Sequence, residues 1–352
     1  MKFAAPATVR LPARLLAITA PALALASCAP AESSTQSASG VSPVTGTLFV
    51  ANKRGDSLSQ IDLATGEEQF RVSACKNPHE LAVSPDGGHV ALACYGGTQI
   101  IIFETSRSLV AQRLLLGENA QPHGIVWHPN GDLYVTAEGR KSIYWIKDPL
   151  SVAPKQLEYA TGQEGSHMLT VSPDGNHAWT TDLGSKTVTL VDLKTRRAPR
   201  SVEVGIEPEG IALTPDGKTL WVSARRSDKA FALDPMTLEI RSEVETGVFP
   251  LRLAIRPQGD VAVTSDLGDT SLTVIDLASA QAVRSIAVDD RANATKRAQV
   301  TILWSADGER IYVAETGTNT VAEVDYRTGE VLRRLATGEG GDGMAILSGN
   351  SE

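Results

Sequence analysis

The stretch from Gly205 to Gly247 reads GIEPEGIALTPDGKTLWVSARRSDKAFALDPMTLEIRSEVETG, and it is the clearest copy of a unit that recurs along the chain. It contains four short runs of alternating apolar and polar residues, separated by Pro-Asp-Gly and Asp-Pro turns. These runs cover residues 210–214, 219–223, 230–233 and 239–245. Alternation between tight turns predicts four antiparallel strands in each unit.

The unit recurs at nearly constant spacing. The turn residue that corresponds to Pro215 in the other units falls at Pro85, Pro129, Pro173, Pro257 and Ala306, and the steps along the chain are 44, 44, 42, 42 and 49 residues. Repeats of about 40 to 50 residues with four strands each are typical of β-propellers. Seven units of about 42 residues would occupy nearly 300 residues, so the chain of 352 residues holds one large domain.

The seventh unit is divided between the two ends of the repeat region. Residues 343–347 match a first strand without the strands that follow it, whereas residues 47–72 supply second, third and fourth strands without a first. Pairing the two segments closes the ring and removes an exposed sheet edge. The sequence therefore predicts an all-β, seven-bladed propeller over residues 47–348, followed by a short tail, residues 349–352.

The first 27 residues are typical of a signal peptide. Three basic residues, Lys2, Arg10 and Arg14, precede an apolar stretch over residues 15–25 that is too short for a permanent membrane span. Residues 28–46 are rich in Ser, Ala, Pro and Thr and contain few large apolar side chains, so we expect a flexible tether before the propeller.

The leader ends in Leu25-Ala26-Ser27-Cys28, which resembles the lipobox of bacterial lipoproteins. This resemblance implies that Cys28 is lipidated, becomes the first residue of the mature chain and anchors it to a membrane. Ala29 follows the cysteine, which by the same resemblance implies sorting to the outer membrane. We therefore expect a lipid-anchored protein of the bacterial cell envelope that faces the periplasm or the cell surface.

The charge of the chain restricts its partners. The formal net charge is −8, and without the three basic residues of the leader 30 basic face 41 acidic residues, a net charge of −11. An acidic protein of this kind is not expected to bind nucleic acid. Cationic or neutral partners fit better, and contact with a membrane is expected only through the lipid anchor.

Two further cysteines lie in one predicted blade. Cys75 comes just before a first strand and Cys94 ends the second strand, and these two positions share a face of the blade. In an oxidising envelope compartment such a pair favours a disulfide, with a metal dithiolate as the alternative.

Three histidines occupy the same position of consecutive units when the units are aligned on the turn residue. His79, His123 and His167 each stand at the start of a first strand. The other four units carry Glu209, Leu251, Val300 and Asp342 at that position. These residues should surround one mouth of the central channel, where imidazoles from adjacent blades would converge on one ion or one small molecule.

Carboxylates are expected at the same mouth, because second strands end there at Glu138, Asp182, Asp266 and Glu315. Imidazoles beside carboxylates suit Zn²⁺ or Cu²⁺, so we predict a metal site formed by His79, His123, His167, Glu209 and Asp182. The alternative is a polar rim of a water-filled channel without a ligand. The remaining histidines, His89, His128 and His177, are predicted to lie at the surface.

Several runs resemble the YVTN-type propeller repeat, among them TLFVANKRGDSLSQIDLATGE (residues 47–67), DLYVTAEGRKSIYWIKD (132–148) and RIYVAETGTNTVAEVDYRTGEVLRRLATGEG (310–340). The stretch PHGIVWHPNGDLYVTAEG (122–139) is similar to phrases of lactonase and streptogramin-lyase propellers, which are divalent-metal enzymes. That similarity implies a catalytic role for His123 or His167 with Glu138, although no complete ligand set of those enzymes can be placed on this sequence.

Three functions follow as hypotheses. The first is a binding protein for a metal or a small molecule at the histidine-lined mouth. The second is a metal-dependent lyase or lactonase that uses the same face, and the third is a scaffold for other envelope proteins that uses the acidic surface.

Overall fold

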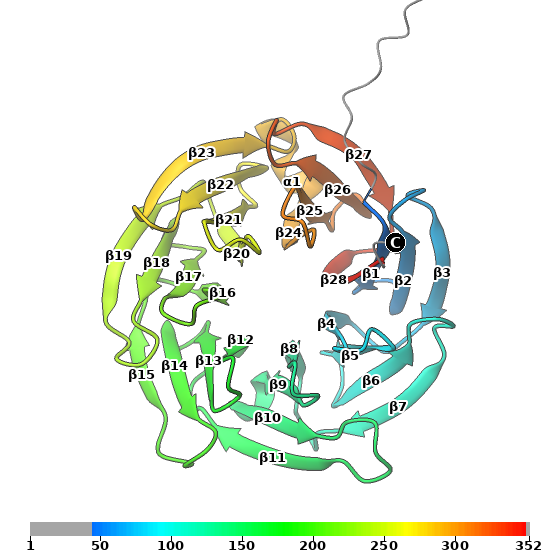
Figure 1. Cartoon of the computed structure of the whole chain (residues 1–352), viewed down its shortest axis with the longest axis vertical. Coiled ribbons are helices and arrows are strands. Elements are labelled where there is room, and N and C mark those ends of the chain that lie inside the picture. Colours follow the sequence, from blue (N-terminus) through cyan, green and yellow to red (C-terminus); the bar gives the residue numbers. More distant parts are fainter. Residues whose placement is uncertain (1–43, 350–352) are drawn as a thin grey trace, which may run out of the picture. The chain divides into compact units, whose positions relative to one another are not determined.

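The computed structural model describes residues 44–349, which form seven four-stranded antiparallel sheets around a central opening (Figure 1). The predicted signal peptide, the lipidation site Cys28 and most of the predicted tether lie outside the described residues. Within residues 44–349, no helix has the length and apolar character needed to cross a membrane.

The strands follow the predicted repeat. Blade 1 contains β4 (Pro78–Val83), β5 (His89–Cys94), β6 (Gln99–Glu104) and β7 (Val110–Leu115). Blade 2 contains β8 (Pro122–Trp127), β9 (Leu133–Ala137), β10 (Ser142–Lys147) and β11 (Lys155–Ala160). Blade 3 contains β12 (Ser166–Val171), β13 (His177–Asp182), β14 (Thr187–Asp192) and β15 (Arg200–Glu203).

The second half of the ring repeats this order. Blade 4 contains β16 (Pro208–Leu213), β17 (Leu220–Ala224), β18 (Lys229–Leu233) and β19 (Ile240–Glu245). Blade 5 contains β20 (Pro250–Ile255), β21 (Val261–Asp266), β22 (Ser271–Asp276) and β23 (Gln281–Ala287). Blade 6 contains β24 (Gln299–Trp304), β25 (Arg310–Glu315), β26 (Thr320–Asp325) and β27 (Val331–Ala336).

Blade 7 closes the ring as the sequence predicts. Its strands are β28 (Gly341–Ser348), β1 (Gly46–Asn52), β2 (Ser57–Asp62) and β3 (Glu68–Ser73), in that order across the sheet. The innermost strand β28 pairs antiparallel with β1, so that Gly46 lies opposite Ser348 and Phe49 opposite Ala345. The two ends of the repeat region therefore form one sheet.

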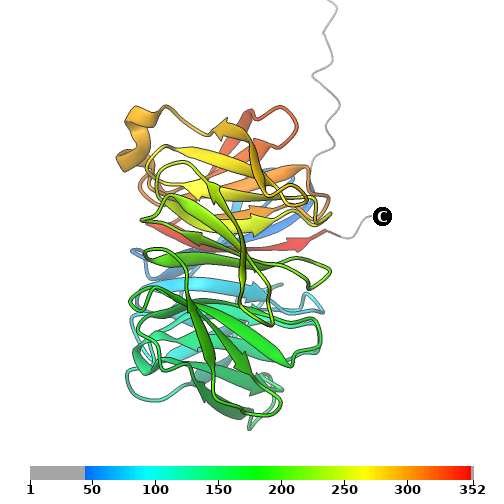
Figure 2. The same ribbon diagram turned by 90° about the vertical axis from the view of Figure 1, so that its left-hand side faces the viewer.

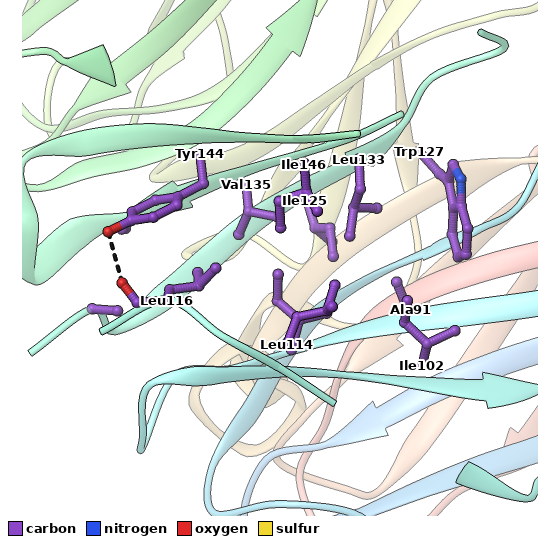
Figure 3. Close-up of a cluster of buried hydrophobic side chains, with 13 residues drawn as sticks. Ala91, Ile102, Leu114, Leu116, Ile125, Trp127, Leu133, Val135, Tyr144 and Ile146 are labelled. Atoms are coloured by element: carbon purple, nitrogen blue, oxygen red, sulfur yellow. Dashed lines mark hydrogen bonds between the residues drawn. The ribbon is translucent and has the colours of Figure 1, made fainter. Parts of the chain in front are cut away.

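The core lies between neighbouring blades and not at the centre of the ring. Figure 3 shows one such cluster, where Leu114 of blade 1 meets Leu133 and Val135 of blade 2. The phenol of Tyr144 in the same cluster donates a hydrogen bond of 2.7 Å to the carbonyl of Leu116. Each sheet is covered by apolar side chains on both faces, because each packs against two neighbours. The aromatic residues of second strands are buried in these layers: Tyr134, Trp179, Trp221 and Tyr312.

Aspartates in the turns between first and second strands are structural, as the repeat predicts. The amide of Gly88 donates a 3.0 Å hydrogen bond to Asp86 Oδ1, and the amide of Asn176 does the same to Asp174 at 3.0 Å. Hydrogen bonds from the Ser172 hydroxyl and from Asn176 lower the pKa of Asp174 to about 2. These carboxylates hold the turns and are not available for chemistry.

The first strand of each of blades 1 to 6 begins with a β-bulge. In blade 1, pairing with β5 jumps from Pro78 to Leu81, which leaves His79 and Glu80 unpaired between them. The same shift occurs between Pro122 and Ile125 in blade 2. A bulge changes the direction of side chains that would otherwise alternate between the two faces of a sheet. At this place it brings two consecutive residues of a strand to the channel.

Hydroxyl groups of second strands fix these bulges to the next blade. Thr136 Oγ1 accepts a 2.8 Å hydrogen bond from the Gly124 amide and donates a 2.6 Å bond to the carbonyl of His167. The Thr181 hydroxyl donates a 2.8 Å hydrogen bond to the carbonyl of Glu209. The Ser265 hydroxyl donates a 2.6 Å hydrogen bond to the carbonyl of Val300. The carbonyls of His167, Glu209 and Val300 are thus held by the preceding blade.

Candidate functional site

A cavity of about 400 Å³ opens at the end of the channel where the innermost strands begin. We call this end the mouth face, and the end with the Pro-Asp-Gly turns the turn face. The mouth cavity is lined by Lys53, Arg54, His79, His123, His167, Glu209, Arg225, Phe249, Leu251, Arg252, Leu267, Ala298, Val300, Thr316 and Asp342. Every residue that the sequence alignment placed at the start of an innermost strand is therefore part of one cavity.

The three aligned histidines form a stack along one side of the mouth cavity. The ring centroids of His79 and His123 are 4.6 Å apart, and those of His123 and His167 are 3.6 Å apart. The middle ring is almost fully enclosed, since His123 is 1% exposed. The structure thus brings together imidazoles from β4, β8 and β12, which lie in three consecutive blades.

Carboxylates contact the two outer histidines of the stack. His79 Nδ1 lies 3.2 Å from Asp342 Oδ2 on β28. His167 Nδ1 lies 3.3 Å from Glu138 Oε2, and its Nε2 lies 3.5 Å from Glu209 Oε1. The Nδ1 atom of His123 has no hydrogen-bond partner among the described residues.

The stacked rings have different proton affinities. Burial holds the pKa of His123 well below its ordinary value, and the neighbouring His167 and His79 lower it further. Burial also disfavours the charged form of His167, but hydrogen bonds with Glu138 and Glu209 outweigh it and raise the pKa of His167. At neutral pH His123 is therefore a neutral imidazole beside a neighbour that takes up a proton more readily.

Arg252 spans the channel beneath the histidines. Its Nη2 atom lies 2.8 Å from Glu80 Oε1, and its Nη1 atom forms an ion pair with Glu209. Arg252 belongs to β20 of blade 5 and Glu80 to β4 of blade 1, on different sides of the central opening in Figure 1. Arg225 pairs with Glu209 as well. The Arg252 bridge to these carboxylates thus forms the floor of the mouth cavity.

Burial and ion pairing determine whether the carboxylates in the floor of the mouth cavity are ionised. Although burial opposes ionisation of Glu209, the charges of Arg252, His167 and Arg225 lower its pKa to about 2. Asp342 behaves in the same way, because the hydrogen bond from His79 and the charge of Lys53 outweigh the effect of burial and hold its pKa far below the ordinary value. Both carboxylates are ionised at neutral pH.

The opposite side of the cavity is apolar. Its residues come from blades 5 and 6 and from the loops before and after their strands: Phe249, Leu251, Leu267, Ala298 and Val300. Most of this side is continuous with a buried cluster that includes Leu251, Val300 and Met344. The mouth cavity therefore has one side of imidazoles and carboxylates and one side of hydrocarbon.

Two carboxylates predicted at the mouth lie inside their blades instead. Asp182 is fully buried and accepts hydrogen bonds from the hydroxyls of Ser166, Thr180, Thr187 and Thr189. Asp266 accepts from Thr264, Ser271 and Thr273 in the same manner. The structure does not bring Asp182 to the histidine stack, whereas Glu209 and Glu138 do contact it. Within residues 44–349, no group of three or more His, Cys, Asp or Glu side chains is arranged to hold a metal ion.

Sequence reasoning missed Glu80 and Arg252. Each directly follows a residue of the aligned position, His79 and Leu251, and strict alternation would direct it away from the channel. The bulge interrupts this alternation, so that two consecutive residues of the strand reach the channel. For Arg252 a signal was present in the hydroxyl residues near the ends of second strands, Thr136, Thr181 and Ser265, which secure the bulges of blades 2, 3 and 5. Blade 1, which carries Glu80, has Ala93 at that position.

The predicted disulfide is confirmed. Cys75 and Cys94 are joined across the start of blade 1, with their Cα atoms 5.8 Å apart. The next residue, Tyr95, places its ring 4.8 Å from His79 and 5.4 Å from His123 between centroids. The disulfide thus fixes a loop that covers the histidine stack.

The prediction that His89, His128 and His177 all lie at the surface is wrong for His128. This residue is 5% exposed, and its Nε2 atom is 3.1 Å from the carbonyl of Ser172 in the next blade. It takes the serine position of a turn, and the ring reaches the adjacent turn and becomes buried there. His89 and His177 are half-buried at the starts of their strands.

Comparison with known proteins supports the fold and leaves the activity open. No model of a protein family matches the chain, and no curated protein matches it. Among solved structures, the dihydro-heme d1 dehydrogenase NirN in complex with DHE is similar with a TM-score of 0.63 at 13% identity, over 86% of this chain and 75% of that chain. A streptogramin B lyase structure is similar with a TM-score of 0.62 at 16% identity, over 78% of this chain and 91% of that chain.

These likenesses show a shared propeller fold, and at such identities they show the fold alone. The protein is a seven-bladed β-propeller with a polar cavity at one end of its channel. The likeness to streptogramin-lyase propellers that the sequence suggested is confirmed at the level of the fold.

Proposed function

We propose that this propeller binds a small molecule in the mouth cavity. The observation that carries the proposal is the cavity itself, about 400 Å³ in volume, with three stacked imidazoles on one side and a floor made by the Arg252 bridge. Ligand sites are typically concave, about 300 to 1,000 Å³ in volume, and combine apolar walls with a few converging polar groups. The mouth cavity has these properties.

The arrangement of the rings favours a molecule over a single metal ion. Imidazole lone pairs lie in the ring planes, and the rings of His123 and His167 lie one over the other with centroids 3.6 Å apart and planes inclined by 31°, so their lone pairs are not directed at one point between them. The outer rings also already direct nitrogens at Asp342, Glu138 and Glu209. Metal binding would require these contacts to be broken and the rings to turn.

Catalysis of an elimination or a lactone opening is a second candidate, and the state of His123 favours it. Its pKa is well below the ordinary value, so the ring is unprotonated at physiological pH, although it is a weaker base than a free imidazole, and its Nδ1 atom has no partner among the described residues. Tyr95 lies beside it. Turnover of a panel of lactones that disappears in the His123→Phe variant would favour this candidate over simple binding.

The binding site is proposed to act in the bacterial cell envelope, on the basis of the leader and the lipobox-like sequence before Cys28. A Cys28→Ser variant should then move from the membrane fraction to the soluble fraction of the producing cells. Wild-type protein in the soluble fraction would contradict the anchor.

The binding proposal is tested by a fragment screen with ligand-observed NMR on protein purified without a histidine tag. We expect fragments that compete for one site in the wild-type protein and lose binding in the double variant His123→Phe/His167→Phe. The matched control is His177→Phe, which changes a half-buried histidine near the turn face. Equal binding by all three proteins, or no site-specific binding by the wild type, would contradict the proposal.

A further inference from the structure

The charged groups of the mouth cavity are already neutralised by one another. Lys53 Nζ is 3.1 Å from Asp342, and Arg54 Nε is 3.7 Å from Glu339. Arg225 Nε is 2.7 Å from Glu207. Together with the Arg252 bridge, these pairs leave no lining cation without a carboxylate. An ionic ligand would lose its hydration without gaining a free counter-charge.

The apolar side offers a surface without hydrogen-bonding groups. Leu251 and Val300 are 7% and 6% exposed, and Phe249 and Leu267 pack on the same cluster at its edge. Phe249 adopts a left-handed backbone conformation, with φ of 60°, at the entrance of β20. Its ring is also 5.3 Å from the guanidinium of Arg225, which keeps it at the cavity. A ligand body of hydrocarbon or aromatic character fits against this side.

The polar side still has unused hydrogen-bonding capacity. His123 Nδ1 has no partner among the described residues although the side chain is nine-tenths or more buried. A buried ring nitrogen without a partner costs free energy, and a ligand hydroxyl, amide or carbonyl in contact with the stack would remove that cost. His123 lines the cavity from blade 2, and the apolar residues line it from blades 5 and 6 and the loops beside their strands.

From these three observations we infer that the ligand is an uncharged amphipathic small molecule. Its apolar body lies against Phe249, Leu251 and Val300, and its hydrogen-bonding group meets the histidine stack at His123. This inference rests on the proposed binding function and adds the chemical class of the ligand.

The test uses three probes of nearly equal shape and different charge: 2-naphthamide, 2-naphthoate and 2-naphthylmethylamine. Their dissociation constants are measured by ligand-observed NMR at pH 7.5 on the untagged protein. We expect the neutral amide to bind at least about tenfold more tightly than either ion, because the paired charges of the cavity give neither ion a partner. Val300→Thr preserves the side-chain shape and adds a hydroxyl, so it should weaken amide binding several-fold.

The control for Val300→Thr is Leu150→Ser, which removes an exposed apolar side chain from a groove at the turn face. It should leave amide binding unchanged. Thermal unfolding of each variant confirms that it is folded. The inference is overturned if naphthoate or the amine binds as tightly as the amide, or if Val300→Thr leaves the affinity unchanged.

The failure of this inference can be told apart from failure of the binding proposal. If only the ionic probes bind, and His123→Phe abolishes their binding, the mouth cavity is a binding site for ions and the class of ligand is wrong. If none of the probes binds and the fragment screen finds no ligand for the cavity, both the inference and the proposed function are wrong.

Discussion

Asp266, at the end of the second strand of blade 5, makes the stability of this propeller depend on pH. Asp266 is fully buried and lies among hydroxyl groups, and burial raises its pKa to about 6 from the ordinary 3.8. The corresponding residue of blade 7 is Asn52, whose amide donates to Ser57 and Ser59. The same position, surrounded by hydroxyl groups, is therefore occupied by an ionisable side chain in blade 5 and by a neutral side chain in blade 7.

We predict that Asp266→Asn stabilises the protein above pH 6. The folded state binds the Asp266 proton more tightly than the unfolded chain, so this group favours folding below pH 3.8 and loses that effect as the pH rises to about 6. Removing the ionisation should recover stability on the order of 3 kcal/mol at pH 8, less whatever the altered hydrogen bonds cost.

Thermal unfolding at pH 4.5 and pH 8 measures this difference. The Tm of the Asn variant relative to wild type should be higher at pH 8 than at pH 4.5. Asp216→Asn is the matched control at an exposed turn, where hydrogen bonds from Thr214 and the Lys218 amide lower the pKa of the aspartate. Asn at this exposed position should destabilise the protein by nearly the same amount at pH 4.5 and pH 8, because a carboxyl with a lowered pKa contributes its stability throughout the range above 3.8.

At the scale of the element, the bulge at the start of each innermost strand is what creates the site. In blade 2 the bulge is secured by a hydroxyl from the second strand, because Thr136 accepts a hydrogen bond from the Gly124 amide and donates one to the carbonyl of His167. We predict that Thr136→Val, which keeps the shape of the side chain, lowers the stability by about 2 kcal/mol or more, because two buried backbone groups lose a partner.

The same change should weaken ligand binding, since the carbonyl of His167 is no longer held. Chemical denaturation and probe titration measure the two effects. Thr98→Val is the control, because the Thr98 hydroxyl makes no hydrogen bond within residues 44–349 and the residue lies in a loop. If both variants behave like wild type, the hydroxyl does not secure the bulge.

These elements also show what the sequence could predict. The strands, the turns, the divided blade and the disulfide can be predicted. They depend on local alternation, turn residues and spacing, which recur from unit to unit in the sequence. The floor of the site depends on Glu80 and Arg252, which are far apart in the chain and meet across the channel. The sequence predicts Asp182 at the mouth because the end of β13 lies there, but its side chain accepts hydrogen bonds from four hydroxyls within its own blade.

At the scale of the whole molecule, the ring depends on one strand that comes from the far end of the chain. β28 pairs with β1 and also packs between blades 6 and 1, and it supplies Asp342 to the mouth cavity. Without it, β1 would present an unpaired edge, and two neighbouring blades would lose an apolar neighbour.

We predict that deletion of residues 341–352 abolishes cooperative unfolding and causes aggregation, whereas deletion of residues 350–352 has no effect. Circular dichroism melting and size-exclusion chromatography distinguish the two truncations. A monomeric 1–340 protein with a sharp thermal transition would show that the ring does not need its closing strand.

The direction of β28 determines on which face of the ring the described chain begins and ends. β28 begins at the mouth face and ends at the turn face, and Gly46 stands opposite Ser348, so the described chain both begins and ends on the turn face. Figure 2 shows the end of β28 on one side of the ring and the α1 segment (Ala294–Arg297) that leads into the mouth on the other. A tag or a solid support coupled at either end of residues 44–349 would therefore leave the mouth cavity unobstructed.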